Sequence, residues 1–176
     1  MTETSPKSGH HHHRSDAPRE IPTAVITVSD TRTVETDTGG ALVAELLGGA
    51  GHPVALREIV ADEPDAIAGA VEKALEREGV RAVILTGGTG VAPRDRTPES
   101  IEPILEREIP GFGELFRALS YEEIGSAALL SRATAGIARG CVLFVLPGSR
   151  GAVRLGMEKL ILPELGHLAG EARKTR

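Results

Sequence analysis

The sequence predicts an α/β fold, a three-layer α/β/α sandwich with a mostly parallel sheet. Short apolar runs alternate along the chain with segments in which apolar residues recur at helical spacing. The apolar runs are continuous instead of alternating with polar residues, which is typical of parallel strands covered on both faces. The 176 residues contain no internal repeat and suit a single domain.

The strands are expected at four apolar runs. Residues 24–28 are followed by a serine and an aspartate, and residues 82–85 are followed directly by a glycine-rich loop. Residues 141–146 end at a proline, and residues 54–60 form a more polar run. Each run has the length of a strand and is followed by a turn signal.

Helices are expected between these strands, because apolar residues recur there at helical spacing. Thr97, Pro98 and Glu99 are typical of a helix start, since they supply a hydroxyl N-cap, a proline at the first helical position and an acid in the first turn. The expected helical segments are residues 42–47, 67–75, 97 onward with a bend at Pro103, 112–119 and 123–130.

The chain ends in a long amphipathic helix. Its apolar residues run from Met157 to Leu168, and Pro163 is expected to kink it. This helix has more apolar positions than one buried face requires, so we expect a subunit interface to cover the surplus.

Residues 1–20 differ from the rest of the chain. They are polar, contain four consecutive histidines and show no apolar periodicity. A purification tag and a natural low-complexity tail would have the same composition. We expect residues 1–20 to form a disordered tail and residues 21–176 to form one domain.

Composition excludes several classes of function. The net charge of -5 argues against a non-specific nucleic-acid binder, which needs a basic face. The single cysteine, Cys141, excludes an internal disulfide framework and begins an apolar run, which favours a core position over a nucleophile. No apolar run approaches the ~18 residues of a membrane span and no secretion signal is present, so we expect a cytoplasmic protein without a membrane partner.

Three of the expected strands end in small or polar loops, at residues 29–31, 86–90 and 147–149. The carboxyl ends of parallel strands lie at the same edge of a sheet, where ligands bind in open α/β folds. We therefore expect these loops to converge on one ligand site.

The loop Thr86-Gly87-Gly88-Thr89-Gly90 carries the strongest signal. Three glycines in five residues let the backbone turn tightly and present N–H groups to an anion. The chain has no Gly-Lys pair, so backbone N–H groups, arginines and a metal would have to bind a phosphate here. A tight turn without a ligand would have the same sequence.

Two aspartates are candidates for metal chemistry. Asp95 lies between Arg94 and Arg96, and a carboxylate flanked by guanidinium groups beside a phosphate cradle suits a divalent metal with bidentate phosphate contacts. A solvated charge cluster is the alternative. Asp62 follows the second strand and is a candidate metal ligand or anchor.

Other polar residues allow two interpretations. Asp65 is expected to cap the helix that begins beside it. Asp37 marks either a helix N-terminus that faces an anion or a plain capping turn. Arg132 lies in a small, apolar stretch and is expected to have an anionic partner, which an internal carboxylate could supply. Outside the tail only His52 and His167 remain, which disfavours a histidine metal site or triad.

Six ordered motifs resemble those of the MoaB/MogA family of molybdenum cofactor biosynthesis proteins, and more closely its MoaB branch. The motifs are residues 26–32 (ITVSDTR), 85–90 (LTGGTG), 94–99 (RDRTPE), 110–114 (PGFGE), 130–132 (LSR) and 146–149 (LPGS). The resemblance implies a molybdopterin-binding α/β/α fold that assembles as a homotrimer or hexamer. It also implies that active members transfer AMP from ATP to the terminal phosphate of molybdopterin with Mg²⁺ and release pyrophosphate.

The resemblance further implies roles for individual residues, with ATP and molybdopterin as substrates. Asp95 and Asp62 are expected to be catalytic and to hold the metal. The expected nucleotide- and phosphate-binding residues are Thr86, Gly87, Gly88, Thr89 and Gly90. The expected pterin-binding residues are Ser29, Asp30, Ser131, Arg132, Pro147, Gly148 and Ser149.

The protein need not supply a nucleophile for such a reaction, because the pterin phosphate would attack the α-phosphorus. Catalysis would rest on holding two anions in line and neutralising their charge. The alternative is a non-catalytic molybdopterin-binding or scaffold protein. Gly39 stands where relatives often carry a serine, and not every MoaB-type protein is clearly an active transferase.

Overall fold

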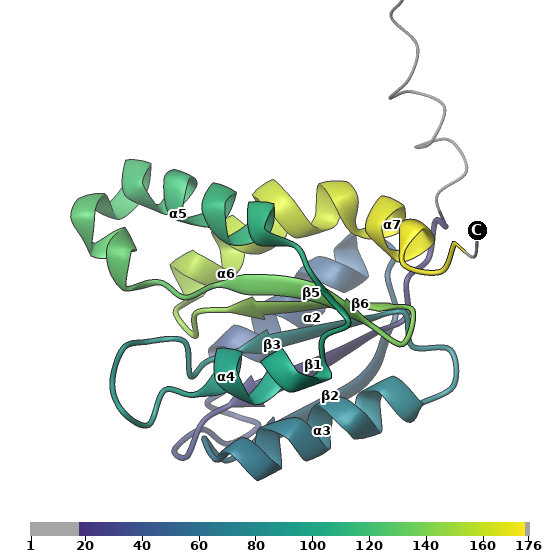
Figure 1. Cartoon of the computed structure of the whole chain (residues 1–176), viewed down its shortest axis with the longest axis horizontal. Coiled ribbons are helices and arrows are strands. Elements are labelled where there is room, and N and C mark those ends of the chain that lie inside the picture. Colours follow the sequence, from purple (N-terminus) through teal and green to yellow (C-terminus); the bar gives the residue numbers. More distant parts are fainter. Residues whose placement is uncertain (1–17, 175–176) are drawn as a thin grey trace, which may run out of the picture.

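The structure is a computed structural model that describes residues 18–174, so the expectations for residues 1–17 lie outside the described residues. The described residues form a six-stranded sheet in the order β2-β1-β3-β6-β5-β4. Helices cover both faces of this sheet, as Figure 1 shows, which confirms the three-layer α/β/α sandwich. The strands are β1 Thr23–Val28, β2 Val54–Val60, β3 Ala82–Thr86, β4 Arg107–Glu108, β5 Thr134–Ala138 and β6 Cys141–Leu146.

The sheet is mostly parallel, as expected. Strand β1 pairs in parallel with β2 and β3, and β3 pairs in parallel with β6. Strands β5 and β4 add an antiparallel edge. A turn joins β5 to β6 at Arg139 and Gly140, whose φ angles of 49° and 71° suit a two-residue hairpin. Strands β4 and β5 were not predicted, because β5 is short and rich in Ala and Gly and β4 has only two residues.

The helices are α2 Thr38–Gly49, α3 Pro64–Glu76, α4 Thr97–Ile101, α5 Pro110–Ile124, α6 Arg150–Gly156 and α7 Leu162–Glu171. The segments expected at 42–47, 67–75 and 112–119 lie within α2, α3 and α5. Helix α4 is short, and a 3₁₀ helix that contains Pro103 follows it, in agreement with the expected bend. The segment expected at 123–130 is instead the end of α5 followed by a 3₁₀ helix at Gly125–Leu130.

The C-terminal helix is interrupted by a π-helical turn at Met157–Ile161, between α6 and α7. Pro163 is the second residue of α7, just after this turn, and a proline removes a backbone donor and crowds the carbonyl four residues before it. The expected surplus of exposed apolar side chains on this helix is wrong. Ile161 and Leu165 are fully buried, and between residues 157 and 168, all described, no large apolar side chain is exposed.

Exposed apolar side chains gather instead on α5 and the 3₁₀ helix after it. They are Leu115, Tyr121, Ile124, Leu129 and Leu130. The homotrimer or hexamer implied by the resemblance stays a prediction. Among the described residues, no helix is long and apolar enough to cross a membrane.

An apolar core lies on each face of the sheet. Successive residues of β3 serve opposite faces, since Ile84 packs in the core with α2, α5 and the C-terminal helix, whereas Leu85 packs in the core with α3. Strands β1, β3 and β6 are buried along their whole length, which explains their continuous apolar runs. Cys141 is 4% exposed at the start of β6, so its expected core position is confirmed.

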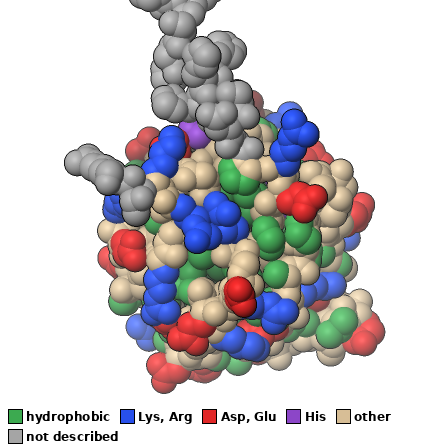
Figure 2. All heavy atoms as spheres, turned by 90° about the vertical axis from the view of Figure 1, so that its right-hand side faces the viewer, with side chains coloured by type: hydrophobic (Ala, Val, Ile, Leu, Met, Phe, Trp, Pro, Cys, Tyr) green, Lys and Arg blue, Asp and Glu red, His purple; other side chains and the backbone are tan. Residues whose placement is uncertain are grey.

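The parallel strands begin at the end of the molecule that Figure 2 shows. On the described residues of this face, basic and acidic side chains are interspersed with apolar ones. The polar loops that the sequence singled out follow the strands and therefore lie at the opposite end.

Candidate active site at the carboxyl ends of the strands

The loops that follow β1, β3 and β6 meet at one end of the sheet. The Gly87 N–H donates to the Leu146 carbonyl at 3.0 Å, and the Thr86 hydroxyl donates to the Pro147 carbonyl at 3.4 Å. Gly87 also lies against the carbonyl of Val28, the last residue of β1. The expected convergence of the three loops is confirmed.

Gly87 and Gly88 are required by the geometry of the loop. Their φ angles are 109° and 62°, in the region that L side chains rarely adopt. A Cβ on Gly87 would overlap the Val28 carbonyl oxygen, and a Cβ on Gly88 would overlap the Thr97 hydroxyl. The two glycines thus let the loop pack tightly between β1 and α4.

The same loop leaves backbone donors open. Within residues 18–174, no hydrogen bond engages the N–H groups of Gly88, Thr89 or Gly90. Consecutive backbone N–H groups of this kind can receive an anion. The loop is therefore a tight turn that can also bind a phosphate.

Two hollows adjoin at this end of the sheet, with volumes of about 400 and 430 Å³. Gly87, Gly148 and Ser149 line both of them. The first is lined by Gly87, Gly88, Thr89, Gly90, Asp95, Phe116, Ser120, Ile124, Ala127, Leu130, Ser131, Pro147, Gly148, Ser149 and Ala152. The second is lined by Thr27, Val28, Ser29, Thr31, Arg32, Asp37, Gly39, Thr86, Gly87, Gly148 and Ser149. The expected nucleotide and pterin residues therefore interleave instead of forming two separate sets.

Asp95 lies on the wall of the first hollow. Its Oδ2 accepts the Ala92 N–H at 3.0 Å, while its own N–H donates to the Ala92 carbonyl at 2.9 Å. Its carboxylate packs against Gly90, where a Cβ would lie 2.5 Å from Oδ2. Asp95 also lines a third hollow of about 350 Å³ together with Arg96.

Asp62 has an incompletely satisfied carboxylate. Its Oδ1 is buried and has no hydrogen-bond partner among the described residues. Burial raises the pKa of the Asp62 carboxyl above its usual value, and the charges of Asp95 and Glu63 raise it further, although a backbone hydrogen bond at Arg96 acts in the opposite direction. A carboxylate whose pKa is raised beside a second carboxylate is typical of a functional site.

The Thr97 hydroxyl is a second buried polar group here that has no hydrogen-bond partner in the described part of the chain. The expectation that Thr97 caps the helix is wrong, because Arg96 is the N-cap residue and Thr97 begins α4 itself. The Thr97 N–H donates to the Gly88 carbonyl at 3.0 Å, and among the described residues no side-chain cap hydrogen bond forms at the start of α4. Asp62 Oδ1 and Thr97 Oγ1 both lie against Gly88.

The two aspartates suit a metal that arrives with phosphate. In the part of the chain that the structure describes, no three His, Cys, Asp or Glu side chains group closely enough to hold a metal. Mg²⁺ is usually bound by one or two carboxylates together with water and substrate phosphates. The unpartnered Oδ1 of Asp62 and the neighbouring charge of Asp95 fit this type of site.

Asp30 and Ser29 fix the β1 loop. Asp30 Oδ1 accepts the Asp62 N–H at 3.0 Å, and its Oδ2 forms an ion pair with Arg94. Ser29 Oγ accepts the N–H groups of Thr31 and Arg32 at 3.3 and 3.2 Å and lines the second hollow. Asp30 therefore anchors the backbone of Asp62, while Ser29 borders the space that a ligand would occupy.

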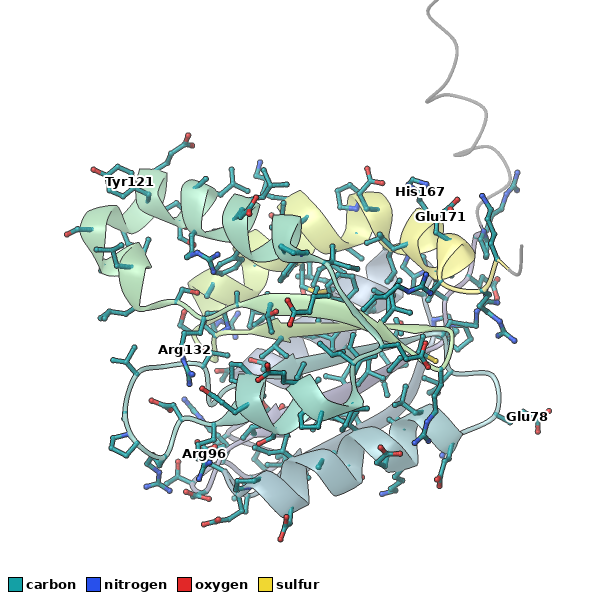
Figure 3. All side chains as sticks on the ribbon, in the orientation of Figure 1. Glu78, Arg96, Tyr121, Arg132, His167 and Glu171 are labelled. Carbon is teal, nitrogen blue, oxygen red and sulfur yellow. The ribbon has the colours of Figure 1, made fainter. Side chains whose placement is uncertain are left out.

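Arg132 has an internal partner. Its guanidinium pairs with Glu99 and donates to main-chain carbonyls of the loop that contains Asp95. Figure 3 shows Arg132 at the same end of the molecule as Arg96. Arg132 borders the third hollow and Ser131 borders the first, so the expected pterin role of Arg132 stays a prediction.

Two of the three remaining candidates, Ser149 and Asp37, cap helices. Ser149 Oγ accepts the Ala152 N–H at 3.2 Å and caps α6. Asp37 Oδ1 accepts the Gly40 N–H at 2.8 Å and caps α2, so the capping interpretation of Asp37 is confirmed. Asp65 lies in the first turn of α3 instead of capping it, because the helix begins one residue earlier.

Sequence reasoning missed the residues that complete these contacts. Thr27 and Arg57 both donate to Asp37, at 2.9 and 2.8 Å. Ser120 and Ile124 of α5 line the first hollow. The sequence did not distinguish Arg57 as a partner of Asp37, since arginines are common in half-polar strands. It did not distinguish the α5 residues either, because they fit the apolar spacing of a helix.

Comparisons with known proteins agree with the geometry. A family model described as "Probable molybdopterin binding domain" matches residues 24–167. The chain is 53% identical over 165 residues to molybdenum cofactor biosynthesis protein B of Bacillus subtilis, covering 93% of this chain and 97% of the relative. It is 48% identical over 165 residues to the protein of the same name from Halalkalibacterium halodurans, with the same coverage.

Solved structures give the same picture. A crystal structure of molybdenum cofactor biosynthesis protein B has a TM-score of 0.88 at 51% identity and covers 90% of this chain and 99% of its own. The tungsten cofactor synthesizing protein MoaB from Pyrococcus furiosus has a TM-score of 0.81 at 43% identity and covers 90% of this chain and all of its own. A structure named MogA is 30% identical, with a TM-score of 0.77, and covers 88% of this chain and 99% of its own. The chain therefore belongs to the MoaB/MogA family of molybdopterin-binding-domain proteins and lies closer to its MoaB branch.

Proposed function

We propose that this protein acts in molybdenum cofactor biosynthesis by transferring AMP from ATP to the terminal phosphate of molybdopterin. The place in cofactor biosynthesis is supported by relatives at about 50% identity that carry that name. The transfer reaction goes beyond those names and rests on the geometry of the site.

One observation carries the proposal. The hollow of about 400 Å³ joins the glycine-rich loop and Asp95 to Ser131 and to residues 147–149. A nucleotide phosphate on the loop and a second anion beside Ser131 would thus share one space. Two reactants bound in one space react faster than free reactants, because binding brings them together and orients them.

The chain's own groups suit phosphoryl transfer. The N–H groups of Gly88, Thr89 and Gly90 are open to phosphate oxygens. An oxygen of the pterin phosphate would attack the α-phosphorus of ATP, the bond from that phosphorus to the bridging oxygen would break, and pyrophosphate would leave with the electron pair. Asp62 and Asp95 would hold Mg²⁺, which would neutralise phosphate charge when bound.

A non-catalytic pterin-binding protein is the second candidate, and one observation favours it. Gly39 lines the second hollow and supplies no hydroxyl there. A Cβ at Gly39 would make ordinary contacts, 3.4 Å from the Gly148 carbonyl oxygen and 3.5 Å from Thr86 Oγ1. The site thus has room for a Cβ at this position.

Pyrophosphate release from ATP and Mg²⁺ separates the two candidates. We expect release that depends on molybdopterin, that is lost in Asp95→Asn and that is kept in Asp65→Asn, an exposed carboxylate on the first turn of α3. Molybdopterin binding without any pyrophosphate release would overturn the transferase and support the non-catalytic candidate.

A further inference from the structure

The guanidinium of Arg132 closes the loop that carries Asp95. Its Nε donates to the Gly90 carbonyl at 2.8 Å and to the Thr89 carbonyl at 3.4 Å, and its Nη2 donates to the Asp95 carbonyl. These acceptors lie 37 to 43 residues away in the sequence. Nε and Nη2 form one edge of the planar guanidinium, so this edge joins the first and last residues of the segment 90–95.

Besides Arg132, the ion pair between Arg94 and Asp30 links the loop to the rest of the fold, but the Arg94 side chain is 67% exposed and such a pair contributes little. Residues 91–94 are exposed, and Val91 is 64% exposed. A segment with little buried apolar surface opens easily unless polar contacts hold it. Inside the segment, the Asp95–Ala92 hydrogen bonds form a local turn but do not tie it to the rest of the fold.

Glu99 completes the arrangement from the other side. Its carboxylate forms an ion pair with Arg132 Nη1, and it lies on α4, directly after the loop. Although burial alone would raise the pKa of Glu99, hydrogen bonds from its own backbone and from Arg132 lower it. The Arg132 side chain is only 30% exposed, and its donors are directed at groups of the protein.

We infer that Arg132 is a positioning residue that holds the Asp95 loop closed through its carbonyl groups and does not itself bind substrate. Lysine could supply the charge but not the planar edge that reaches two carbonyls at once. The adjacent Leu130 and Ser131 line the first hollow, so the same short segment borders the ligand space and fixes the Asp95 loop. The consequence for catalysis rests on the proposed function, whereas the closure of the loop does not.

Limited proteolysis tests loop closure without any reference to activity. Trypsin cleavage after Arg94 and Arg96 is followed by mass spectrometry in the wild type, Arg132→Lys and Arg132→Gln, with cleavage after Arg77 as the internal control. Arg77 is exposed and lies at the end of α3. We expect both variants to be cut about tenfold faster at Arg94 and Arg96 and at an unchanged rate at Arg77.

Glu99→Gln is the matched variant, because it removes the ion pair and leaves the carbonyl contacts in place. We expect it to be cut less than threefold faster than the wild type. Unchanged cleavage at Arg94 and Arg96 in both Arg132 variants would overturn the inference. An increase in the cleavage rate at Arg77 as well as at Arg94 and Arg96 would also overturn it, since this would show that the whole fold has become less stable.

Steady-state kinetics test the catalytic consequence. We expect Arg132→Lys to lower kcat about tenfold with little change in the KM for molybdopterin, because a displaced Asp95 impairs the reaction and not substrate binding. A rise in this KM at constant kcat would assign Arg132 to the pterin and overturn the positioning role. If the wild type releases no pyrophosphate, the proposed function fails, while the cleavage pattern still decides the role of Arg132.

Discussion

Asp37 and Asp62 occupy matching places at the same end of the sheet, yet their carboxylates differ in their hydrogen-bond partners. Each follows a strand and precedes a helix. Asp37 is 2% exposed and uses both carboxylate oxygens, since Oδ1 accepts from Gly40 and Oδ2 accepts from Thr27 and Arg57. Asp62 has a buried oxygen that finds no hydrogen-bond partner within residues 18–174.

The difference supports a structural role for Asp37 and, under the proposed function, a catalytic role for Asp62. A buried carboxylate with a complete set of hydrogen bonds rigidifies its surroundings. A carboxylate left short of partners, beside a second carboxylate and an open loop, is destabilising unless a ligand completes it. The contrast thus assigns Asp37 to the α2 cap and Asp62 to the site.

The largest effect is expected for Asp62→Asn on catalysis. The amide removes the negative charge that would hold the metal, so we expect molybdopterin-dependent pyrophosphate release to fall by about 10²- to 10³-fold. Stopped-flow or coupled assays of pyrophosphate measure this. Wild-type turnover in the variant would place Asp62 outside the catalytic machinery.

Asp37→Asn should act on stability instead. The amide still caps α2 but leaves Arg57 without its carboxylate, and Arg57 is partly exposed, so the cost is reduced by solvent. We expect the free energy of unfolding to fall by about 2 kcal/mol in urea titrations. A change no larger than that of Asp65→Asn, within about 0.5 kcal/mol, would contradict the structural role of Asp37.

Two threonines sharpen the same contrast. The Thr27 hydroxyl donates to Asp37, whereas the buried Thr97 hydroxyl, beside Asp62, has no partner among the described residues. We expect Thr27→Val to lower the free energy of unfolding by about 1 kcal/mol and Thr97→Val to leave it unchanged or raise it by up to about 1 kcal/mol. Chemical denaturation of both variants decides this, and equal losses would show that the Thr97 hydroxyl is bonded.

The smallest effect is the dependence of stability on pH. The pKa of Asp62 is raised in the folded state, so the folded protein binds the proton more tightly than the unfolded chain. The stabilisation that this tighter proton binding gives is fully present at pH values below 3.8, the usual pKa of the carboxyl. It is lost as the pH rises through the raised pKa of the folded state. The stability of the wild type relative to Asp62→Asn should therefore decline as the pH rises through this range. A relative stability that rises with pH would show that folding lowers this pKa.

Much of the fold follows from local pattern, because buried central strands have continuous apolar runs and the loops after them are polar. Strands β4 and β5 were missed, since a short Ala- and Gly-rich strand depends on pairing with β6 and carries little signal of its own. The cap at Thr97 was predicted wrongly, because the loop after β3 packs over it.

The candidate site follows from the sequence in outline only. Position at the strand ends places the glycine loop, Asp62 and Asp95 together. The acceptors of Arg132 are main-chain carbonyls, which have no residue identity that a sequence could reveal. The missing partner of Asp62 depends on burial by segments distant in the chain, so it too requires the structure.

The most direct test measures Asp62→Asn and Asp37→Asn side by side, as the free energy of unfolding and as pyrophosphate release from ATP, Mg²⁺ and molybdopterin. We predict that Asp62→Asn loses pyrophosphate release while being at least as stable as the wild type, and that Asp37→Asn is the variant that loses stability. An Asp62→Asn protein that is as destabilised as Asp37→Asn, or that releases pyrophosphate at the wild-type rate, would contradict the account.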